Sequence, residues 1–358
     1  MRDLAPLLRE LYFDDTKVED VFPLATCAAL GSITIPHSLR DLNILRNMPT
    51  LQRISQTLDL RKARPAQSAA EFWAEYDSGG SAREAEARLN AALEKLRQLD
   101  GWNEDRFKKL SDGTFRADLH KLPIRDLTIL RDIPVSVLNI QNTEVQRIGP
   151  LAGSPIREFD GDHAPITDLA VVSRWPLEKL RINVIDTADA SHLRGLKLRW
   201  LEMSNVTPYY IPFDLAALKG MPLETFRGFG FTGLSLKPLE GAPLKELWLR
   251  SCKDVDLRIL RGKALTVLVL RDTAIADTAP IRNLPLTLID LMGTQIRDVS
   301  WLANCQTLES VVLPRGALGV EKLRHLPNLK RISYEAKDWI PTQSADEFWE
   351  QSGKQKKP

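Results

Sequence analysis

Aliphatic residues recur at an almost constant interval along the second half of the chain. Nine of them begin successive blocks, and the steps between them are 21 residues apart from one of 25 and one of 22: Ile156, Leu177, Leu198, Leu223, Leu244, Leu265, Leu286, Leu308 and Leu329. A repeat of this length predicts a solenoid, in which each block forms one coil and stacks on its neighbours. Solenoids usually offer an extended surface and do not enclose a reaction site, so the repeat length also favours a binding function over catalysis.

Each block follows the spacing L-x-x-L-x-L-x-x-T/C-x-I, which is the leucine-rich repeat pattern. One clear copy reads Leu265, Leu268, Leu270, Thr273 and Ile275. The residues at offsets 3 and 5 share one face of a short strand because side chains alternate along a strand. One strand cannot bury them alone, so the copies must stack into a parallel sheet. We therefore expect an α/β solenoid with a parallel sheet on the concave face, a short irregular convex side and helical caps.

The ending of the repeat array occurs twice. Residues 8–55 match residues 286–333 at a constant offset, and both copies continue into a related string, QSAAEFW at 67–73 and QSADEFW at 343–349. Each string holds a capping box, Ser68/Glu71 or Ser344/Glu347, followed by a Phe-Trp pair that can cover the last coil. A third box, Ser81/Glu84, precedes leucines at helical spacing. We read both strings as caps; an aromatic docking motif is the alternative.

These features divide the chain into four parts. Residues 1–78 form a short repeat array with its cap helix, 79–113 a hinge at Gly79-Gly80 and a helical cap, 114–340 the main array, and 341–358 the C-terminal cap helix and tail. The short array has no cap before it. Three explanations stay open: residues 2–7 cover its apolar edge, another chain covers it, or the chain is a remnant of a longer protein. Self-association through this edge is therefore one expectation.

The composition of the chain bears on its expected partners and cellular compartment. The 358 residues carry a net charge of +2, which predicts no nucleic-acid partner, and no apolar stretch predicts a signal peptide or a membrane span. The three cysteines occupy repeat positions and form no disulfide framework. Reduced cytoplasm is the expected compartment.

Motifs for catalysis and cofactors are weak. Residues 228–233 spell G-x-G-x-x-G, but they fall inside a repeat and not between a strand and a helix, so the glycines more simply relieve crowding beside the longer preceding repeat. The histidines are scattered without metal-ligand spacing, and no nucleophile elbow, phosphate loop or kinase signature occurs. We expect a non-enzymatic protein without cofactor or metal.

The same register maps the concave surface, because offsets 2, 4 and 6 must point away from the core. Glu158, Asp160 and Asp162 form an acidic strand there. Farther along, apolar and arginine residues gather in a patch whose members we predict to bind a protein partner: Trp200, Arg227, Phe229, Trp248, Arg250, Val269, Arg271 and Met292. Exposed Trp and Arg are enriched at interface hot spots. The alternative is that outward positions vary by chance. The insertion at 208–213 is a second candidate, either as an interaction loop or as a segment buried against the next repeat.

Three local motifs support a family resemblance. They are block tails of the form D-x-x-P-L/I, the closing segment Pro327–Ser333 and the E-F-W caps. Together they resemble the C-terminal repeat tails of planctomycete and verrucomicrobial serine/threonine protein kinases. The segment Leu96–Trp102 also resembles the helix that precedes those repeats. The kinase domain is absent, so the resemblance implies a regulatory or target-recruiting module and transfers no catalytic residue. Internalin-like repeats are similar in spacing, but they are secreted and this chain shows no export signal. The primary expectation is a scaffold that recognises a protein on its concave face.

Overall fold

The computed structural model describes residues 7–14, 16, 18, 21–36, 39, 42–78, 81–184, 190–205 and 214–354. The chain divides into two compact units, Met1–Ser136 with Glu144–Pro155, and Val137–Thr143 with Ile156–Pro358. Three predicted features lie outside the described residues: the hinge at Gly79-Gly80, the N-terminal cover at residues 2–6, and the insertion at 208–213. Among the described helices, none is long and apolar enough to cross a bilayer.

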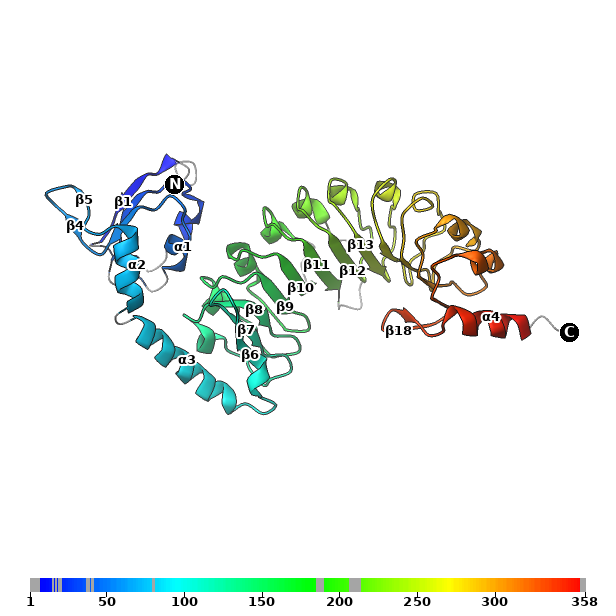
Figure 1. Ribbon diagram of the computed structural model, residues 1–358, viewed down its shortest axis with the longest axis horizontal. Coiled ribbons are helices and arrows are strands. Elements are labelled where there is room, and N and C mark those ends of the chain that lie inside the picture. The colour runs from blue at the N-terminus through cyan, green and yellow to red at the C-terminus, as the bar shows by residue number, and fades with distance from the viewer. Residues whose placement is uncertain are drawn as a thin grey trace. The chain divides into compact units, whose positions relative to one another are not determined.

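The repeats form the predicted parallel sheet (Figure 1). Within the described residues it is 12-stranded, and neighbours in sequence are neighbours in the sheet. Its first pair, β6 and β7, is antiparallel, and the pairs from β8 onward are parallel. The strands are β6 Phe107–Lys109, β7 Phe115–Asp118, β8 Val135–Asn139, β9 Glu158–Gly161, β10 Lys179–Val184, β11 Trp200–Asn205, β12 Thr225–Phe229, β13 Glu246–Arg250, β14 Val267–Val269, β15 Leu288–Asp290, β16 Ser310–Val312 and β17 Arg331–Ser333.

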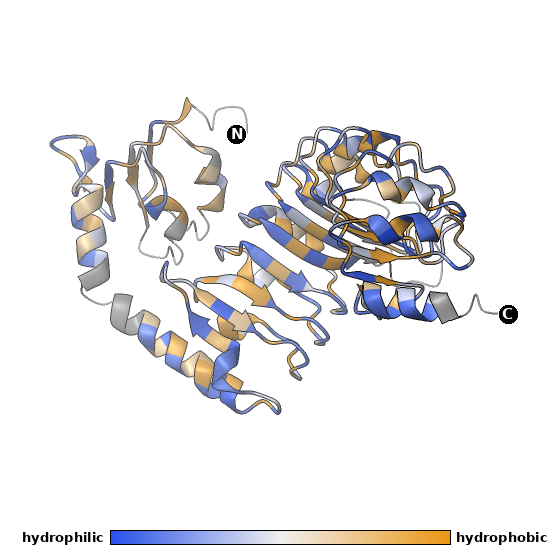
Figure 2. Cartoon of the chain, turned by 45° about the vertical axis from the view of Figure 1, so that its right-hand side comes forward, coloured by the Kyte–Doolittle hydropathy of each residue, from blue (hydrophilic) through white to orange (hydrophobic). Residues whose placement is uncertain are grey.

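The strand register is the one that the sequence predicts. Leu201 pairs with Phe226, Phe226 with Leu247, and Leu247 with Leu268, and all four side chains are buried. Outward neighbours alternate with these core residues, and Figure 2 shows the corresponding bands of hydrophilic and hydrophobic residues. The aliphatic positions of successive repeats therefore meet in a continuous core, as stacking requires.

Two repeats place phenylalanine where the others have a smaller aliphatic residue, and each compensates with glycine two positions later. A Cβ on Gly228 would lie 3.3 Å from the ring of Phe226, and one on Gly161 would lie 2.9 Å from the ring of Phe159. The first glycine of the G-x-G-x-x-G string thus makes room for an aromatic ring in the core. The crowding at Gly228 therefore comes from a ring of its own repeat, whereas Gly230 meets the longer preceding repeat, where a Cβ would lie 3.0 Å from the Asn205 carbonyl oxygen.

Short 3₁₀ turns carry the chain along the convex side, as expected for an irregular return path. They are η4 Thr128–Leu130, η5 Gly149–Leu151, η6 Leu169–Arg174, η7 Ser191–Leu193, η8 Leu215–Leu218, η9 Lys237–Leu239, η10 Arg258–Leu260, η11 Ser300–Asn304 and η12 Val320–His325. A recurrent aspartate precedes several of these turns. Asp214, Asp256 and Asp298 each accept the backbone N–H two residues later, at 2.8–2.9 Å. This is an Asx turn, which orients the chain for the next element.

The N-terminal unit holds a smaller parallel sheet, β1 Glu10–Tyr12, β2 Ser32–Thr34 and β3 Arg53–Ser55, in that order. The connecting segments include η2 Phe22–Thr26 and α1 Asn43–Arg46. Ile33, Ile54 and Leu45 form its core with other buried aliphatic residues. Helix α2 Ala69–Ser78 and the longer helix α3 Ser81–Arg97 follow, and η3 Glu104–Arg106 leads into β6. The predicted helix after residue 80 is therefore present, although the side chains of Ser81 and Glu84 lie outside the description.

The two copies of the repeated ending fold alike. In each, a strand, a short antiparallel hairpin and a helix follow one another: β3, β4–β5 (Leu58–Asp59 and Arg64–Pro65) and α2, then β17, β18–β19 (Ala336–Lys337 and Ile340–Pro341) and α4 Ala345–Lys354. Both predicted capping boxes form; Ser68 N–H donates to Glu71 and Ser344 N–H to Glu347, each at 2.8 Å. Phe72 and Phe348 are buried, which supports the cap interpretation. The hairpins between strand and helix were not predicted.

Candidate binding surface on the concave sheet

Charged and aromatic side chains follow one another across the concave strands in a single row. The register aligns Asp160 with Arg181, Arg181 with Glu202, Glu202 with Arg227, and Arg227 with Trp248. Each step is one strand, so neighbouring side chains lie about 4.8 Å apart along the row. The acidic strand and the arginine patch, which the sequence analysis treated separately, are therefore joined.

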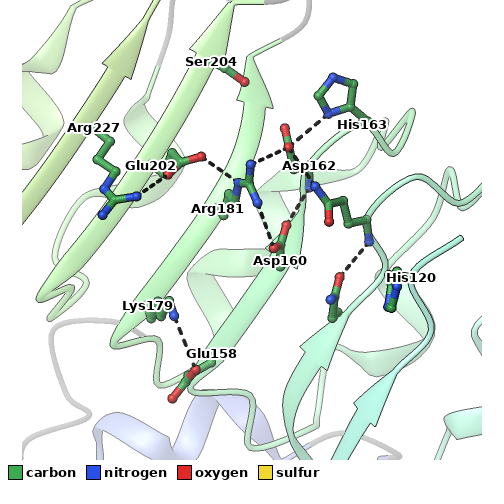
Figure 3. Close-up of polar contacts among 12 residues, drawn as sticks. His120, Glu158, Asp160, Asp162, His163, Lys179, Arg181, Glu202, Ser204 and Arg227 are labelled. Carbon is green, nitrogen blue, oxygen red and sulfur yellow. Dashed lines mark hydrogen bonds and ion pairs between the residues drawn. The ribbon is translucent and has the colours of Figure 1, made fainter. Parts of the chain in front are cut away.

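Arg181 is the centre of an ionic ladder, which we define as Asp160, Asp162, Arg181, Glu202, Arg227 and Glu246. Its guanidinium lies 2.7 Å from Glu202 Oε1, 2.9 Å from Asp162 Oδ2 and 3.5 Å from Asp160 Oδ2 (Figure 3). Each carboxylate comes from a strand, or a strand end, next to β10. One guanidinium presents five N–H donors in a planar fork, which allows it to serve all three.

The ladder continues toward the aromatic side through Arg227. Its guanidinium lies 3.5 Å from Glu202 Oε2 and 3.6 Å from Glu246 Oε2. The same group stacks on the indole of Trp248, with 4.2 Å between Cζ and the ring centroid, and it lies 5.4 Å from that of Trp200. The Trp248 indole N–H donates to Glu246 at 3.0 Å. Arg227 thus joins the ionic ladder to a cation–π stack.

Burial sets the protonation behaviour of the ladder. Removal from water raises the pKa of Asp160 and of Glu202 above the usual values, against the opposing pull of the neighbouring guanidinium groups. For Arg181, burial alone lowers the pKa, but the carboxylates of Glu202, Asp160 and Asp162 outweigh it and raise the pKa. The arginine therefore stays charged and holds the acidic side chains together.

A second, more deeply buried ion pair lies beyond Trp248. Arg271 Nε donates to Asp290 Oδ2 at 2.9 Å, and neither side chain is appreciably exposed. Burial raises the pKa of Asp290, while the hydrogen bonds from Met292 N–H and Arg271 oppose that rise. Asp290 also faces Val269 in the register.

The eight predicted partner-binding residues lie on neighbouring strands of this face or, for Arg271 and Met292, two residues after a strand. We call them the aromatic–arginine patch: Trp200, Arg227, Phe229, Trp248, Arg250, Val269, Arg271 and Met292. Their predicted exposure is only partly correct. Val269 is 0% exposed, and Trp248 and Arg271 are each 8% exposed. Trp200, Arg227, Phe229 and Met292 are half-buried, whereas the Arg250 side chain is 52% exposed.

Trp339, at the tip of the β18–β19 hairpin, contributes to the cover over the patch. Its ring is nearly parallel to that of Phe229, at 9° and 6.1 Å between centroids, and perpendicular to that of Trp248, at 88° and 5.4 Å. The guanidinium groups of Arg271 and Arg250 lie 4.6 and 5.7 Å from its centroid. The repeat pattern predicts which side chains of a strand point away from the core. It does not predict that Trp339 packs on them, because Trp339 belongs to a different element.

The contact leaves part of the patch open. A hollow of about 290 Å³ lies beside the indole, lined by Asn205, Phe229, Gly230, Arg250, Ser251 and Trp339. Gly230 has a positive φ of 76°, and a Cβ there would lie 3.0 Å from the Asn205 carbonyl oxygen. Close backbone approach therefore keeps one wall of the hollow free of side chain.

The described residues show no group of three or more His, Cys, Asp or Glu side chains that could hold a metal ion. His163 lies 3.0 Å from Asp162 and His120 2.7 Å from Asp118, but these are pairs in separate places. Cys27, Cys252 and Cys305 are buried and unpaired with one another. Burial raises the pKa of the Cys252 thiol to about 11, so it stays protonated at neutral pH.

The repeats, their register and the helical caps together define a leucine-rich repeat solenoid. Among solved structures, the chain is similar to an internalin (inlF) from Listeria monocytogenes str. 4b F2365, with a TM-score of 0.50 and 15% sequence identity over 93% of this chain and 82% of that chain. It is also similar to an internalin C2 from the same strain, with a TM-score of 0.27 and 22% identity over 56% of this chain and 69% of that one. No protein-family model matches the chain, and no curated protein matches its sequence.

The likeness to the first internalin shows the fold alone. It carries no information on a partner at this level of identity. Nothing in the comparisons supports the kinase-associated origin that the sequence motifs suggested.

Proposed function

We propose that the chain is a non-enzymatic scaffold that binds a protein partner on its concave face. The observation that carries the proposal is the continuous row of Arg181, Glu202, Arg227 and Trp248, in which Glu202 pairs with both arginines and Arg227 stacks on the indole. Rows of this kind combine the residue types that dominate interface energetics, namely Trp and Arg, on one rigid sheet.

The accessible groups indicate what the partner brings. Arg250 is the most exposed member of the patch, and the partly exposed ring of Phe229 faces it in the register. Trp200, two strands away on β11, offers a second partly exposed ring. A matching surface would carry an aromatic or aliphatic anchor and a carboxylate for Arg250. Pre-paired arginines need little reorganisation on binding, which reduces the cost in side-chain entropy.

The test compares co-purification from the native host of the wild-type chain and of the double variant Trp248→Ala/Arg250→Ala, quantified by mass spectrometry. A protein bound through the patch should be enriched by the wild type and reduced at least about tenfold by the double variant, since removing hot-spot residues costs about 2 kcal/mol or more. Arg258→Ala is the matched control, because Arg258 is exposed on the convex turn η10 and pairs with Asp256, two residues before it.

The circular dichroism spectrum and melting temperature should identify variants that fail to fold. A recovered partner that binds the double variant as well as the wild type would contradict the proposal. Loss of the same partner with Arg258→Ala would instead place the surface on the convex side.

The narrower hypothesis of a regulatory or target-recruiting segment of a kinase-like protein makes a separate prediction. The gene immediately upstream should then encode a kinase that ends in leucine-rich repeats.

Self-association through the N-terminal sheet edge is tested by sedimentation velocity over a range of concentrations.

A further inference from the structure

The β18–β19 hairpin makes a contact that capping does not require. Its counterpart β4–β5 belongs to a cap with the same construction: Arg53 and Arg331 donate to the carbonyls of Pro65 and Pro341, and Ala69 and Ala345 N–H donate to Gln52 and Lys330. The cation–π contacts of the two cap tryptophans are also equivalent, Arg46 with Trp73 and Arg324 with Trp349.

The two hairpins differ at their tips. The N-terminal one carries Leu60, which is 86% exposed, and four residues, 60–63, separate its strands. The C-terminal one is two residues shorter and carries Trp339 at its tip. Because the cap with Leu60 forms the same anchoring contacts, the docking of Trp339 is an addition to the cap and not a part of it.

The backbone of the shorter tip is strained in order to present the indole. Asp338 and Trp339 connect β18 to β19, and their φ angles are 49° and 69°. A two-residue hairpin of type I′ has positive φ at both central positions, which glycine and asparagine adopt easily and a bulky residue does not. Strain of this kind persists where the surrounding structure compensates for it, often at functional sites.

The receiving site is built from two neighbouring strands and the segment that follows the next strand. We define the cage as Phe229 of β12, Trp248 and Arg250 of β13, and Arg271, which follows β14. It surrounds the indole with one parallel ring, one perpendicular ring and two guanidinium groups. Figure 1 shows the hairpin reaching from α4 back toward these strands. Apart from Trp339, which is half-buried, most of the hairpin is exposed, and Ile340 is an example.

We propose that the cage is a receptor for an aromatic side chain presented on a tight turn, and that Trp339 occupies it in cis as an internal ligand. This inference rests on the proposed function and names the partner's chemistry: a protein segment that places a tryptophan at the tip of a hairpin. Such a partner binds by displacing the hairpin, because the same rings and guanidinium groups cannot hold two indoles.

The tethered hairpin is a competitor of high effective concentration, on the order of millimolar for a short connection. If it is docked for about nine-tenths of the time, it weakens the apparent affinity for an external segment about tenfold. Removing the indole should therefore open the cage and strengthen binding by that factor.

The experiment uses the full chain and a defined probe, a cyclised peptide with the sequence of residues 335–342. The Trp248 indole N–H signal in a nuclear magnetic resonance titration reports occupation of the cage. Trp339→Gly is the main variant, since glycine favours the same turn and removes only the indole. Asp338→Gly is its matched control, because it relaxes the turn in the same way but keeps Trp339.

We expect saturable shifts with Trp339→Gly and at least tenfold weaker binding with wild type and Asp338→Gly. A peptide in which tryptophan is replaced by alanine should cause no shift. Equal binding by wild type and Trp339→Gly would overturn the internal-ligand role, and no shift with Trp339→Gly, or equal shifts with the alanine peptide, would overturn the receptor role. Either failure leaves the co-purification result untouched, so the two proposals are tested separately.

Discussion

At the scale of single residues, the core shows compensation between ring size and backbone space. Phe226 fills the volume that Gly228 leaves, and Phe159 does the same beside Gly161. The sequence predicted crowding against the preceding repeat, and not the contact between Gly228 and Phe226, because the pattern records position and not volume.

This compensation predicts strong coupling between the two positions. Gly228→Leu should destabilise the fold by about 1–3 kcal/mol through overpacking, and Phe226→Leu by about 1 kcal/mol or more through a cavity. The double variant restores the leucine pattern of other repeats, so it should be more stable than Gly228→Leu alone. Urea unfolding of the three variants measures the coupling, and additive losses would refute the explanation.

Arg181 is the second residue-scale case. Arg181→Met leaves Asp160, Asp162 and Glu202 without their shared cation. We expect the free energy of unfolding to fall by about 2–3 kcal/mol. This loss is smaller than for a fully buried ion pair because Arg181 is partly exposed. The matched control is Arg199→Met, because Arg199 is more exposed and its partner Glu224 also contacts Lys245. Chemical denaturation of both variants gives the comparison, and equal losses would contradict a special role for Arg181.

At the scale of elements, the repeat pattern predicted the strands, their order and their register, because each depends on local spacing. The β18–β19 hairpin could not be predicted in the same way. Its turn contains Asp338 and Trp339 in place of the usual glycine or asparagine, and its docking depends on strands about 90 residues earlier in the chain. For the same reason the contact between Arg271 and Trp339 was not predicted.

The caps lead to a prediction about pH. Hydrogen bonds from Ser344 lower the pKa of Glu347, so its stabilising effect is present at neutral pH and is lost as the pH falls through that lowered value. Ser344→Ala should lower the melting temperature at neutral pH, because the helix loses its cap, and the difference from wild type should shrink in acid. Thermal unfolding across the acidic range measures this, with Ser68→Ala as the equivalent change in α2. A difference that grows in acid would contradict the assignment.

At the scale of the whole molecule, a stacked sheet gives the concave face a fixed spacing of side chains. The described residues use that spacing to continue the ionic ladder into the aromatic–arginine patch, part of which the chain's own cap covers. Recognition by such a surface depends on residues from several repeats, so its chemistry becomes visible only when the register is known.

The most direct test of this account is hydrogen–deuterium exchange on the wild-type chain with and without the partner recovered by co-purification. The account predicts slower exchange in β11–β14 and faster exchange in residues 335–342 when the partner binds, because the hairpin leaves the cage. Slower exchange confined to the convex 3₁₀ turns, with the hairpin unchanged, would contradict it.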